Sequence, residues 1–224
     1  MTDHPTVDGA AIDLDRLAGT TYTAVFSDVC DSLGLRDQTC APGLTPVVTG
    51  GGTALGWART ARSVAVSGPP PRPYGAEIDF IDSLRPGDLV VATCDEPAAL
   101  WGELFSTAAL GRGARGAVID GLIRDRDKIA TMPFPVFARG YRPTDSLARV
   151  AISGTDEPIT VAGVPARTGD LVVADSDGIV VVPRDVVAEV VPRVLEKATT
   201  EDKARGLLLE GGLLADVWER FRVL

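Results

Sequence analysis

The segment WGELFSTAALGRGARGAVIDGLIRDRD, residues 101–127, decides the expected fold because it joins a helical pattern, a buried strand and a polar loop. Residues 98–110 have helical periodicity, and residues 116–120 form a short apolar run typical of a buried strand. Similar apolar runs stand before and after it, at residues 89–93 and 135–138. Strands and helices that alternate at this spacing predict a βαβ arrangement with right-handed crossovers.

The flanking regions fit the same α/β class. Residues 12–34 have the apolar spacing of a helix, and Gly34 is well placed to end it. Residues 47–66 are rich in Gly, Thr and Val and indicate strands with turns. Residues 150–183 are typical of a run of strands, with the DSDG sequence at 175–178 as a hairpin turn.

The C-terminal part of the chain is predicted to be helical. The helical pattern begins after Arg184 and continues nearly to the end, with Pro192 as a candidate kink. No linker is rich enough in Gly, Pro or Ser to divide the chain, so we expect one domain over residues 1–224 with a helical extension from about residue 185. The sequence GDLVVA occurs at 87–92 and at 169–174, which a duplicated half-domain would explain. The alternative, which we favour, is a turn feeding a buried strand that arose twice.

Composition restricts the classes of partner. Hydrophobic residues make up 45% and the formal net charge is −9, a globular balance with an acidic surface. Such a surface repels phosphate backbones and argues against nucleic acid as the main partner. No apolar run approaches the roughly 20 residues that span a bilayer, and the N-terminus lacks a signal-peptide pattern. We therefore expect a soluble, cytoplasmic protein that has no membrane partner.

Cysteine and histidine usage excludes several kinds of catalytic site. Cys30, Cys40 and Cys94 have no CxxC spacing and form neither a zinc motif nor a disulfide framework, so we interpret them as buried thiols. His4 is the only histidine. Its position near the N-terminus argues against Ser-His-Asp catalysis, Cys-His catalysis and His-rich metal sites.

The candidate site centres on Arg124 and Asp125, which follow a predicted strand, and on Glu103, which stands near the start of a predicted helix. Ligands of α/β sheets gather at strand carboxyl ends and helix N-termini. The Arg124 guanidinium suits a carboxylate or a developing enolate, and Asp125 offers a hard oxygen ligand for Mg²⁺ or Mn²⁺. Glu103 is a candidate to hold metal-bound water or to act as a base through water. The alternative is a surface Arg-Asp pair without function.

Several motifs together resemble one family, which contains the 4-hydroxy-4-methyl-2-oxoglutarate aldolases and the RraA-type regulators of ribonuclease activity. The matching motifs occur in the family's order, from about Val25 to Arg184: VFSDVCDSLG, RPGDLVV, WGELFSTAA, VIDG with Arg124-Asp125, FPVFARG and GDLVVADSDGIVVVPR. The resemblance implies a swivelling-domain type of α/β/α sandwich with a central mixed sheet. It also implies homotrimers or hexamers (dimers of trimers) with active sites between subunits.

The resemblance also implies roles for individual residues. Asp125 would bind the divalent metal directly, and Arg124 would bind substrate and stabilise its enolate. Glu103 would hold metal-bound water. The substrate's pyruvate carboxylate would lie at the start of the helix, at Gly102, Glu103, Leu104 and Phe105.

A further carboxylate would come from the C-terminal region of a neighbouring subunit and reach the metal through water. Glu201 is the main candidate, with Asp202 or Glu196 as alternatives. The alternative function for all three carboxylates is only to solvate a helix. The family commonly has an acidic residue three positions after the metal-binding Asp, where this chain has Lys128. Asp127 is a candidate substitute. Lys128 also raises a Schiff-base mechanism, which its charged surroundings disfavour.

The expected activity is retro-aldol cleavage of a small 4-hydroxy-2-oxo acid to pyruvate, together with decarboxylation of oxaloacetate, since both reactions form the pyruvate enolate. One rival is a regulatory protein that binds and inhibits an RNA-processing enzyme. The resemblance implies that regulators of this type are shorter and lack the site-completing carboxylates, whereas this chain has Glu103 and continues about forty residues past Arg184. Another rival is an inactive scaffold or an enzyme with a shifted reaction, for which Lys128 is the main indication.

Overall fold

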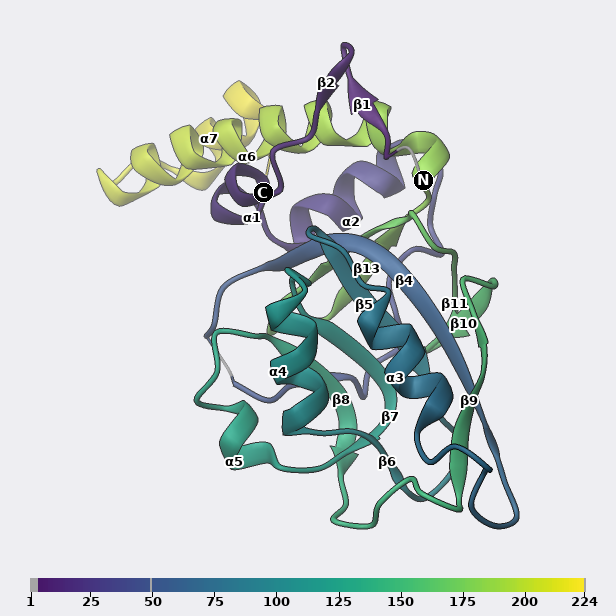
Figure 1. Cartoon of the computed structure of the whole chain (residues 1–224). Coiled ribbons are helices and arrows are strands. Elements are labelled where there is room, and N and C mark those ends of the chain that lie inside the picture. Colours follow the sequence, from purple (N-terminus) through teal and green to yellow (C-terminus); the bar gives the residue numbers. More distant parts are fainter. Residues whose placement is uncertain (1–3, 49, 224) are drawn as a thin grey trace.

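A nine-stranded mixed sheet lies at the centre of this computed structural model, which describes residues 4–48 and 50–223 (Figure 1). Its strands are β3 (Thr45–Pro46), β4 (Ala54–Ala65), β5 (Asp88–Thr93), β6 (Ala99–Trp101), β7 (Ala117–Ile123), β8 (Val136–Tyr141), β9 (Val150–Thr155), β12 (Leu171–Ala174) and β13 (Ile179–Val182). The order is β13-β12-β4-β5-β7-β8-β3, with β6 beside β7 and β9 beside β4. The pairs among β4, β5, β6, β7 and β8 are parallel and the others are antiparallel. The predicted α/β class with a central mixed sheet is confirmed.

The helices and two small hairpins complete the structure. The helices are α1 (Leu14–Thr20), α2 (Thr23–Ser32), α3 (Gly75–Asp82), α4 (Glu103–Gly111), α5 (Arg126–Ile129), the 3-10 helix η1 (Arg184–Val186), α6 (Val187–Leu209) and α7 (Leu214–Phe221). The hairpins pair β1 (Thr6–Val7) with β2 (Ala10–Ala11) and β10 (Ile159–Val161) with β11 (Val164–Ala166). The β5-α4-β7 unit is the predicted βαβ arrangement, with β5 and β7 parallel.

The sheet curls around an apolar core, and helices cover two parts of its outer face (Figure 1). Inside the curl, Leu89 and Val91 of β5 join residues from β7, β8, β12 and β13 and from the β10–β11 hairpin. Because side chains alternate along a strand, the intervening Val90 faces outward, toward α3 and α4. Farther along the outer face, Trp57 and Val173 pack with α1, α2 and α6. The curl therefore lets one sheet support two separate helical layers.

The predicted N-terminal helix is divided in two by an extended segment. Thr21 has φ −135° and ψ 168°, and its hydroxyl donates to the Leu17 carbonyl at 2.6 Å. The second helix, α2, begins at Thr23, whose backbone N–H donates to the Asp175 carboxylate at 2.8 Å. Asp175 belongs to the turn between β12 and β13, so a distant hairpin fixes where α2 starts. Gly34, with φ +79°, follows the end of α2 as predicted.

The predicted helix over residues 98–110 is wrong in its first turn. Residues 99–101 form β6, which pairs with the end of β7, and α4 begins at Glu103. Short apolar runs have no periodicity that separates a buried strand from a buried helix. The Trp101 indole N–H donates to the Ser106 hydroxyl at 2.8 Å, which ties β6 to the first turn of α4.

The two copies of GDLVVA form the same local turn in different sheet contexts. Gly87 and Gly169 have φ +92° and +95°, a left-handed conformation that favours glycine. The buried Asp88 and Asp170 each accept a hydrogen bond from the backbone N–H three residues earlier, at 2.8 and 2.7 Å. However, β5 is parallel to β4 whereas β12 is antiparallel to it. This difference supports a repeated turn rather than a duplicated half-domain.

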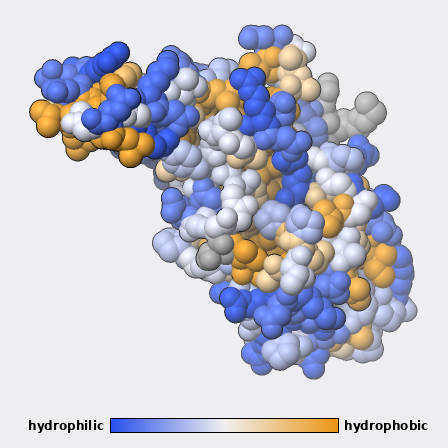
Figure 2. All heavy atoms as spheres, turned by 90° about the vertical axis from the view of Figure 1, so that its left-hand side faces the viewer, coloured by the Kyte–Doolittle hydropathy of each residue, from blue (hydrophilic) through white to orange (hydrophobic). Residues whose placement is uncertain are grey.

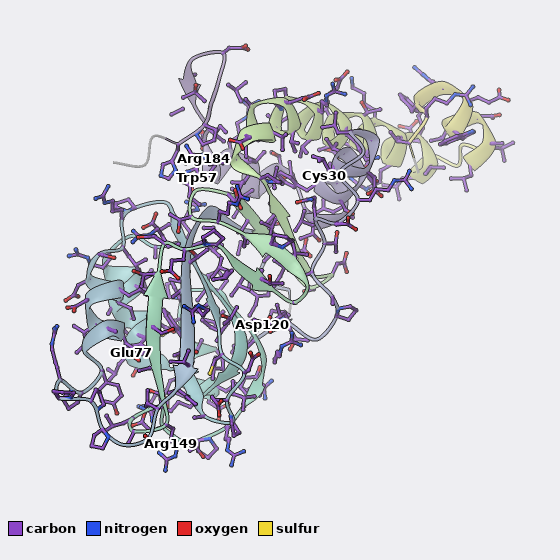
Figure 3. All side chains as sticks on the ribbon, turned by 90° about the vertical axis from the view of Figure 1, so that its right-hand side faces the viewer. Cys30, Trp57, Glu77, Asp120, Arg149 and Arg184 are labelled. Carbon is purple, nitrogen blue, oxygen red and sulfur yellow. The ribbon has the colours of Figure 1, made fainter. Side chains whose placement is uncertain are left out.

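The predicted C-terminal helical extension is confirmed. The α6 helix continues through Pro192, and α7 follows the Gly211-Gly212 pair, so that the two helices form an arm beyond the sheet (Figure 3). Figure 2 shows hydrophobic patches on this arm. The exposed large apolar side chains of the arm are Leu208, Leu209, Leu213, Leu214 and Trp218. Over the described part of the chain, no helix combines the length and apolar character needed to cross a membrane. The expectation of one domain over residues 1–224 stays a prediction.

Candidate active site

A pocket of about 250 Å³ lies where α4 begins, beside the loops that follow β7 and β8. These are carboxyl ends of parallel strands, which is where α/β sheets gather ligands. The pocket is mainly apolar, with charged groups at one side. Its lining residues are Tyr74, Ile78, Ala99, Leu100, Trp101, Gly102, Leu104, Phe105, Arg124, Asp125, Asp145 and Ser146.

Asp125 is held against the start of α4. Its Oδ2 accepts a hydrogen bond from the backbone N–H of Glu103 at 3.2 Å. Gly102, the residue before the helix, makes this approach possible, because a Cβ there would lie 2.8 Å from Asp125 Oδ2. Asp125 itself has φ 60° and ψ 34°, a left-handed conformation uncommon for residues other than glycine. The backbone is therefore bent to direct this carboxylate to the helix terminus.

Arg124 lies between two carboxylates. Its backbone N–H donates to the Trp101 carbonyl at 2.9 Å, which joins the β7 loop to β6. Its Nη1 is 3.2 Å from Asp145 Oδ1, and its Nε is 3.7 Å from Asp125 Oδ2. The Arg124 side chain is 36% exposed, so part of the guanidinium remains accessible to a ligand in the pocket.

Asp145 and Tyr74 complete the polar side of the pocket, and sequence reasoning missed both. The Tyr74 hydroxyl donates to Asp145 Oδ2 while Asp145 Oδ1 pairs with Arg124. Burial raises the pKa of Asp145, but the Tyr74 hydrogen bond, the Arg124 charge and backbone hydrogen bonds from Ser146 and Leu147 together outweigh burial, so the pKa lies below its ordinary value of 3.8. The bond to Asp145, then burial, raises the pKa of Tyr74 above 10.0. Asp145 thus stays ionised and Tyr74 stays protonated, which fixes Arg124.

Asp145 follows β8 in the same way that Asp125 follows β7. The rule that strand carboxyl ends gather ligands would have found it, had it been applied to the RPTDS sequence after β8 as it was to the loop after β7. Tyr74 has no comparable signal. It stands at the start of α3 with φ 55°, after the proline-rich segment, and nothing in its sequence context indicates a site.

The first turn of α4 brings backbone N–H groups to the pocket lining. The amides of Leu104 and Phe105 lie in the first turn, where a helix supplies no internal acceptor. Leu104 is 74% exposed, and the Phe105 ring packs edge-on against Trp101 with centroids 5.7 Å apart. Together with the helix dipole, these amides form a position suited to a carboxylate.

The Glu103 side chain lies outside the pocket lining. Its Oε1 accepts a hydrogen bond from the Thr107 hydroxyl, one helical turn ahead, at 2.9 Å. Only the Glu103 backbone contacts Asp125. Lys128 and Asp127 are exposed on α5 and also lie outside the pocket lining. This exposure agrees with a solvated Lys128 rather than the desolvated amine that a Schiff base requires.

Glu201 lies on α6, away from the pocket of its own chain. It accepts a hydrogen bond from Tyr22 Oη, its Oε1 is 3.2 Å from Lys197 Nζ, and its side chain is 14% exposed. These contacts connect α6 to the segment just before α2. Of the alternative candidates, Asp202 pairs with Arg205, and Glu196 is exposed. Within one chain none of the three joins Asp125 in the pocket lining.

The donor set around Asp125 fits only some metal ions. Within residues 4–48 and 50–223 there is no group of three or more His, Cys, Asp or Glu side chains that could hold a metal. Zinc and most transition metals need such a group. Mg²⁺, by contrast, keeps several waters and is commonly held by one or two carboxylates. Asp125, whose side chain is 39% exposed at the pocket wall, fits an ion of that kind.

Comparisons with known proteins agree with the fold. The family model RraA-like, described as Aldolase/RraA, matches residues 23–181. A protein of Halalkalibacterium halodurans named "Putative 4-hydroxy-4-methyl-2-oxoglutarate aldolase" is 34% identical over 132 residues, which cover 58% of this chain and 62% of that protein. The match to protein DlpA of Legionella pneumophila, at 30% identity, covers 54% of this chain and 20% of that protein. The chain therefore spans less than two thirds of these curated relatives.

Solved structures give a longer match. The crystal structure of RraAS2 from Streptomyces coelicolor, "an unusual member of the RNase ES inhibitor RraA protein family", superposes with a TM-score of 0.75 at 26% identity, covering 92% of this chain and 99% of that one. The agreement thus includes most of the chain. Because the RraA-like family model matches well over half of the residues, the chain belongs to the RraA-like family.

Proposed function

We propose that this chain is a divalent-metal-dependent class II pyruvate aldolase. It cleaves 4-hydroxy-2-oxo acids such as 4-hydroxy-4-methyl-2-oxoglutarate to pyruvate and also decarboxylates oxaloacetate. The observation that carries the proposal is the convergence of Arg124, Asp125 and the start of α4 on one pocket of about 250 Å³. The naming of the Halalkalibacterium relative as an aldolase supports the same reaction class.

Asp125 would hold the ion, Mg²⁺ or Mn²⁺, as its direct protein ligand. When bound, such an ion supplies Lewis-acid polarisation of the substrate's 2-oxo group. We assign Glu103, and Glu201 of a neighbouring subunit in a homotrimer or hexamer, to contacts with the ion through water. The position of Glu103 at the first residue of α4 supports its part of this assignment, because its own backbone N–H donates to Asp125.

The residues of this chain perform three tasks in the proposed reaction. The amides of Leu104 and Phe105 bind the substrate carboxylate at the start of α4. Glu103, acting through water, receives the proton of the C4 hydroxyl. The O–H electron pair forms the new C4 carbonyl bond as the C3–C4 bond breaks. The electron pair of that bond forms the C2=C3 double bond of the enolate, and the π pair of the 2-oxo group moves onto its oxygen. Arg124 stabilises the resulting enolate oxygen.

Asp145 and Tyr74 act through Arg124 and are positioning residues. The pair holds the guanidinium at one end, since Asp145 Oδ1 binds Nη1 and Tyr74 binds the other carboxylate oxygen. A guanidinium fixed before the reaction needs no reorientation as negative charge develops on the substrate. In oxaloacetate decarboxylation the same enolate forms, so Arg124, held by Asp145 and Tyr74, would serve both reactions.

The test measures pyruvate release, coupled to lactate dehydrogenase, from oxaloacetate and from 4-hydroxy-4-methyl-2-oxoglutarate with and without Mg²⁺. Asp125→Ala should abolish metal-dependent release, whereas Asp37→Ala, at an exposed loop position, should not. Arg124→Ala should lower kcat for both substrates by about 100-fold, the cost typical of removing one oxyanion donor. Retained activity in Asp125→Ala would remove this site from consideration, and an Arg124 effect on only one substrate would contradict a shared enolate.

A regulatory function is the alternative, and the likeness to the Streptomyces RraAS2 structure favours it. Under this alternative the chain binds and inhibits an RNA-processing enzyme through its surface and needs no metal. Adding the purified chain to an endoribonuclease assay distinguishes the two functions. The regulatory proposal would replace the aldolase proposal if two results were found together. The unchanged chain would release no pyruvate, and Asp125→Ala would still inhibit the endoribonuclease.

A further inference from the structure

The loops that follow β7 and β8 form a second hollow, of about 370 Å³, which is open to solvent. It shares Arg124 and Asp125 with the pocket described above, so the two hollows meet at these side chains. The residues that line the second hollow are Arg124, Asp125, Arg126, Tyr141, Arg142 and Pro143. Three of these six are arginines and one is acidic, in a chain whose net charge is −9.

Contacts orient two of these arginines without neutralising them. The Arg126 guanidinium lies over the Tyr141 ring, 5.0 Å from its centroid. The Nε of Arg142 donates to the Thr144 hydroxyl at 3.1 Å. Among the side chains that the structure describes, neither arginine forms an ion pair, whereas Arg124 pairs with both neighbouring carboxylates. The second hollow therefore has two guanidinium groups available to an anion.

The two hollows have different chemistry on either side of one pair of residues. The first is lined mainly by apolar side chains and ends at the amides of α4, which suit a pyruvyl group. The second is cationic and open. Because the hollows meet at Arg124 and Asp125, a 4-hydroxy-2-oxo acid with its 2-oxo group at Arg124 and its C1 carboxylate at α4 has the second hollow next to it for its C4 end.

We propose that Arg126 and Arg142 bind a carboxylate on the leaving half of the substrate. The inference rests on the proposed function, and it assigns two specificity-determining residues to the carboxylate that 4-hydroxy-4-methyl-2-oxoglutarate carries at C4. Planar guanidinium groups match carboxylates with paired hydrogen bonds. The leaving product keeps this carboxylate after the C3–C4 bond breaks, so the same two residues hold it until release.

The experiment compares the binding of two ligands that cannot undergo cleavage because both lack a C4 hydroxyl. Calorimetry in Mg²⁺ measures Kd for 2-oxoglutarate, which has a distal carboxylate, and for 2-oxopentanoate, which has a methyl group there. The unchanged chain should bind 2-oxoglutarate at least about tenfold more tightly. The double variant Arg126→Gln, Arg142→Gln should bind the two ligands within about threefold of each other, with 2-oxopentanoate unchanged.

A matched control removes two arginines elsewhere. Arg193 and Arg220 are exposed on α6 and α7, so Arg193→Gln, Arg220→Gln alters the net charge equally and should keep the preference for 2-oxoglutarate. Equal binding of both ligands by the unchanged chain would overturn the proposal, and so would a preference that survives in the Arg126, Arg142 variant. If the preference is lost as expected but no 4-hydroxy-2-oxo acid yields pyruvate, the carboxylate site stands and the aldolase function fails.

Discussion

Replacing Gly102 by alanine would test whether the position of Asp125 matters more than its presence. The added Cβ would lie 2.8 Å from Asp125 Oδ2 and 3.3 Å from Arg124 Cγ. Ordinary contacts begin at 3.4 Å, so the carboxylate must move by about 0.6 Å. Gly102 has φ −156° and ψ −172°, an extended conformation that alanine adopts without strain. The substitution therefore acts on the neighbours of residue 102 rather than on its own backbone.

The expected effect on stability is small and the effect on activity is large. Losing the hydrogen bond from Glu103 N–H to Asp125 costs about 1 kcal/mol of unfolding free energy. The smaller conformational entropy of alanine in the unfolded chain offsets about 0.4–1 kcal/mol of that cost. In active sites a misplacement of about 1 Å lowers the rate about 100-fold. We expect Gly102→Ala to lower kcat/KM for pyruvate release about 10- to 100-fold while the protein stays folded.

The measurement combines a Mg²⁺ titration of pyruvate release with thermal unfolding. Gly111→Ala is the matched control, because it lies at the other end of α4 and a Cβ there would meet nothing within 4 Å. It should leave both the Mg²⁺ dependence and kcat/KM unchanged. Normal activity in Gly102→Ala would refute the reasoning, and an equal loss in Gly111→Ala would assign the effect to the helix rather than to Asp125.

Three further predictions concern other parts of the chain. Because folding lowers the pKa of Asp145, its ionised form stabilises the protein above about pH 4, and this contribution disappears as the pH falls through the lowered pKa. The difference in Tm between the unchanged chain and Asp145→Asn should therefore shrink below about pH 4. Burial raises the pKa of Cys30 to about 11 and of Cys40 to about 12, so at pH 8 both should resist iodoacetamide until the protein is denatured, and mass spectrometry of early alkylation at either thiol would contradict this. Co-refolded Glu201→Ala and Asp125→Ala chains should recover part of the pyruvate release that each lacks alone, and an inactive mixture would count against a site shared between subunits.

The sequence predicted the parts of the fold that depend on local patterns. The apolar run after Gly87, the DSDG turn and the helices after Arg184 all lie where hydrophobic periodicity and turn chemistry indicate. The division of the N-terminal helix was not predictable, because it depends on Asp175, which reaches Thr23 from a position 152 residues away. How the sheet curls was also beyond local patterns, since it follows from strand pairing and sheet twist.

The site was predictable to the extent that its residues are neighbours in sequence. The strand-then-loop pattern indicated Arg124 and Asp125, and the structure brings them to the start of α4. Asp145 and Tyr74 are 71 residues apart, and only the folded chain brings them together beside Arg124. The expected contribution of Glu201 depends on a second subunit and stays a prediction.

The left-handed backbone at Asp125 lowers the stability of the fold at a residue that is proposed to bind the metal. A residue with a Cβ is disfavoured at φ 60°, by up to about 1–2 kcal/mol, and glycine is not. Glycine at position 125 would remove this cost but also the hydrogen bond from Glu103 N–H, worth about 1 kcal/mol, so selection on melting temperature alone should tolerate glycine there even though the proposed activity is lost. Aspartate at this position would then be kept for the ligand it binds and not for the stability of the fold.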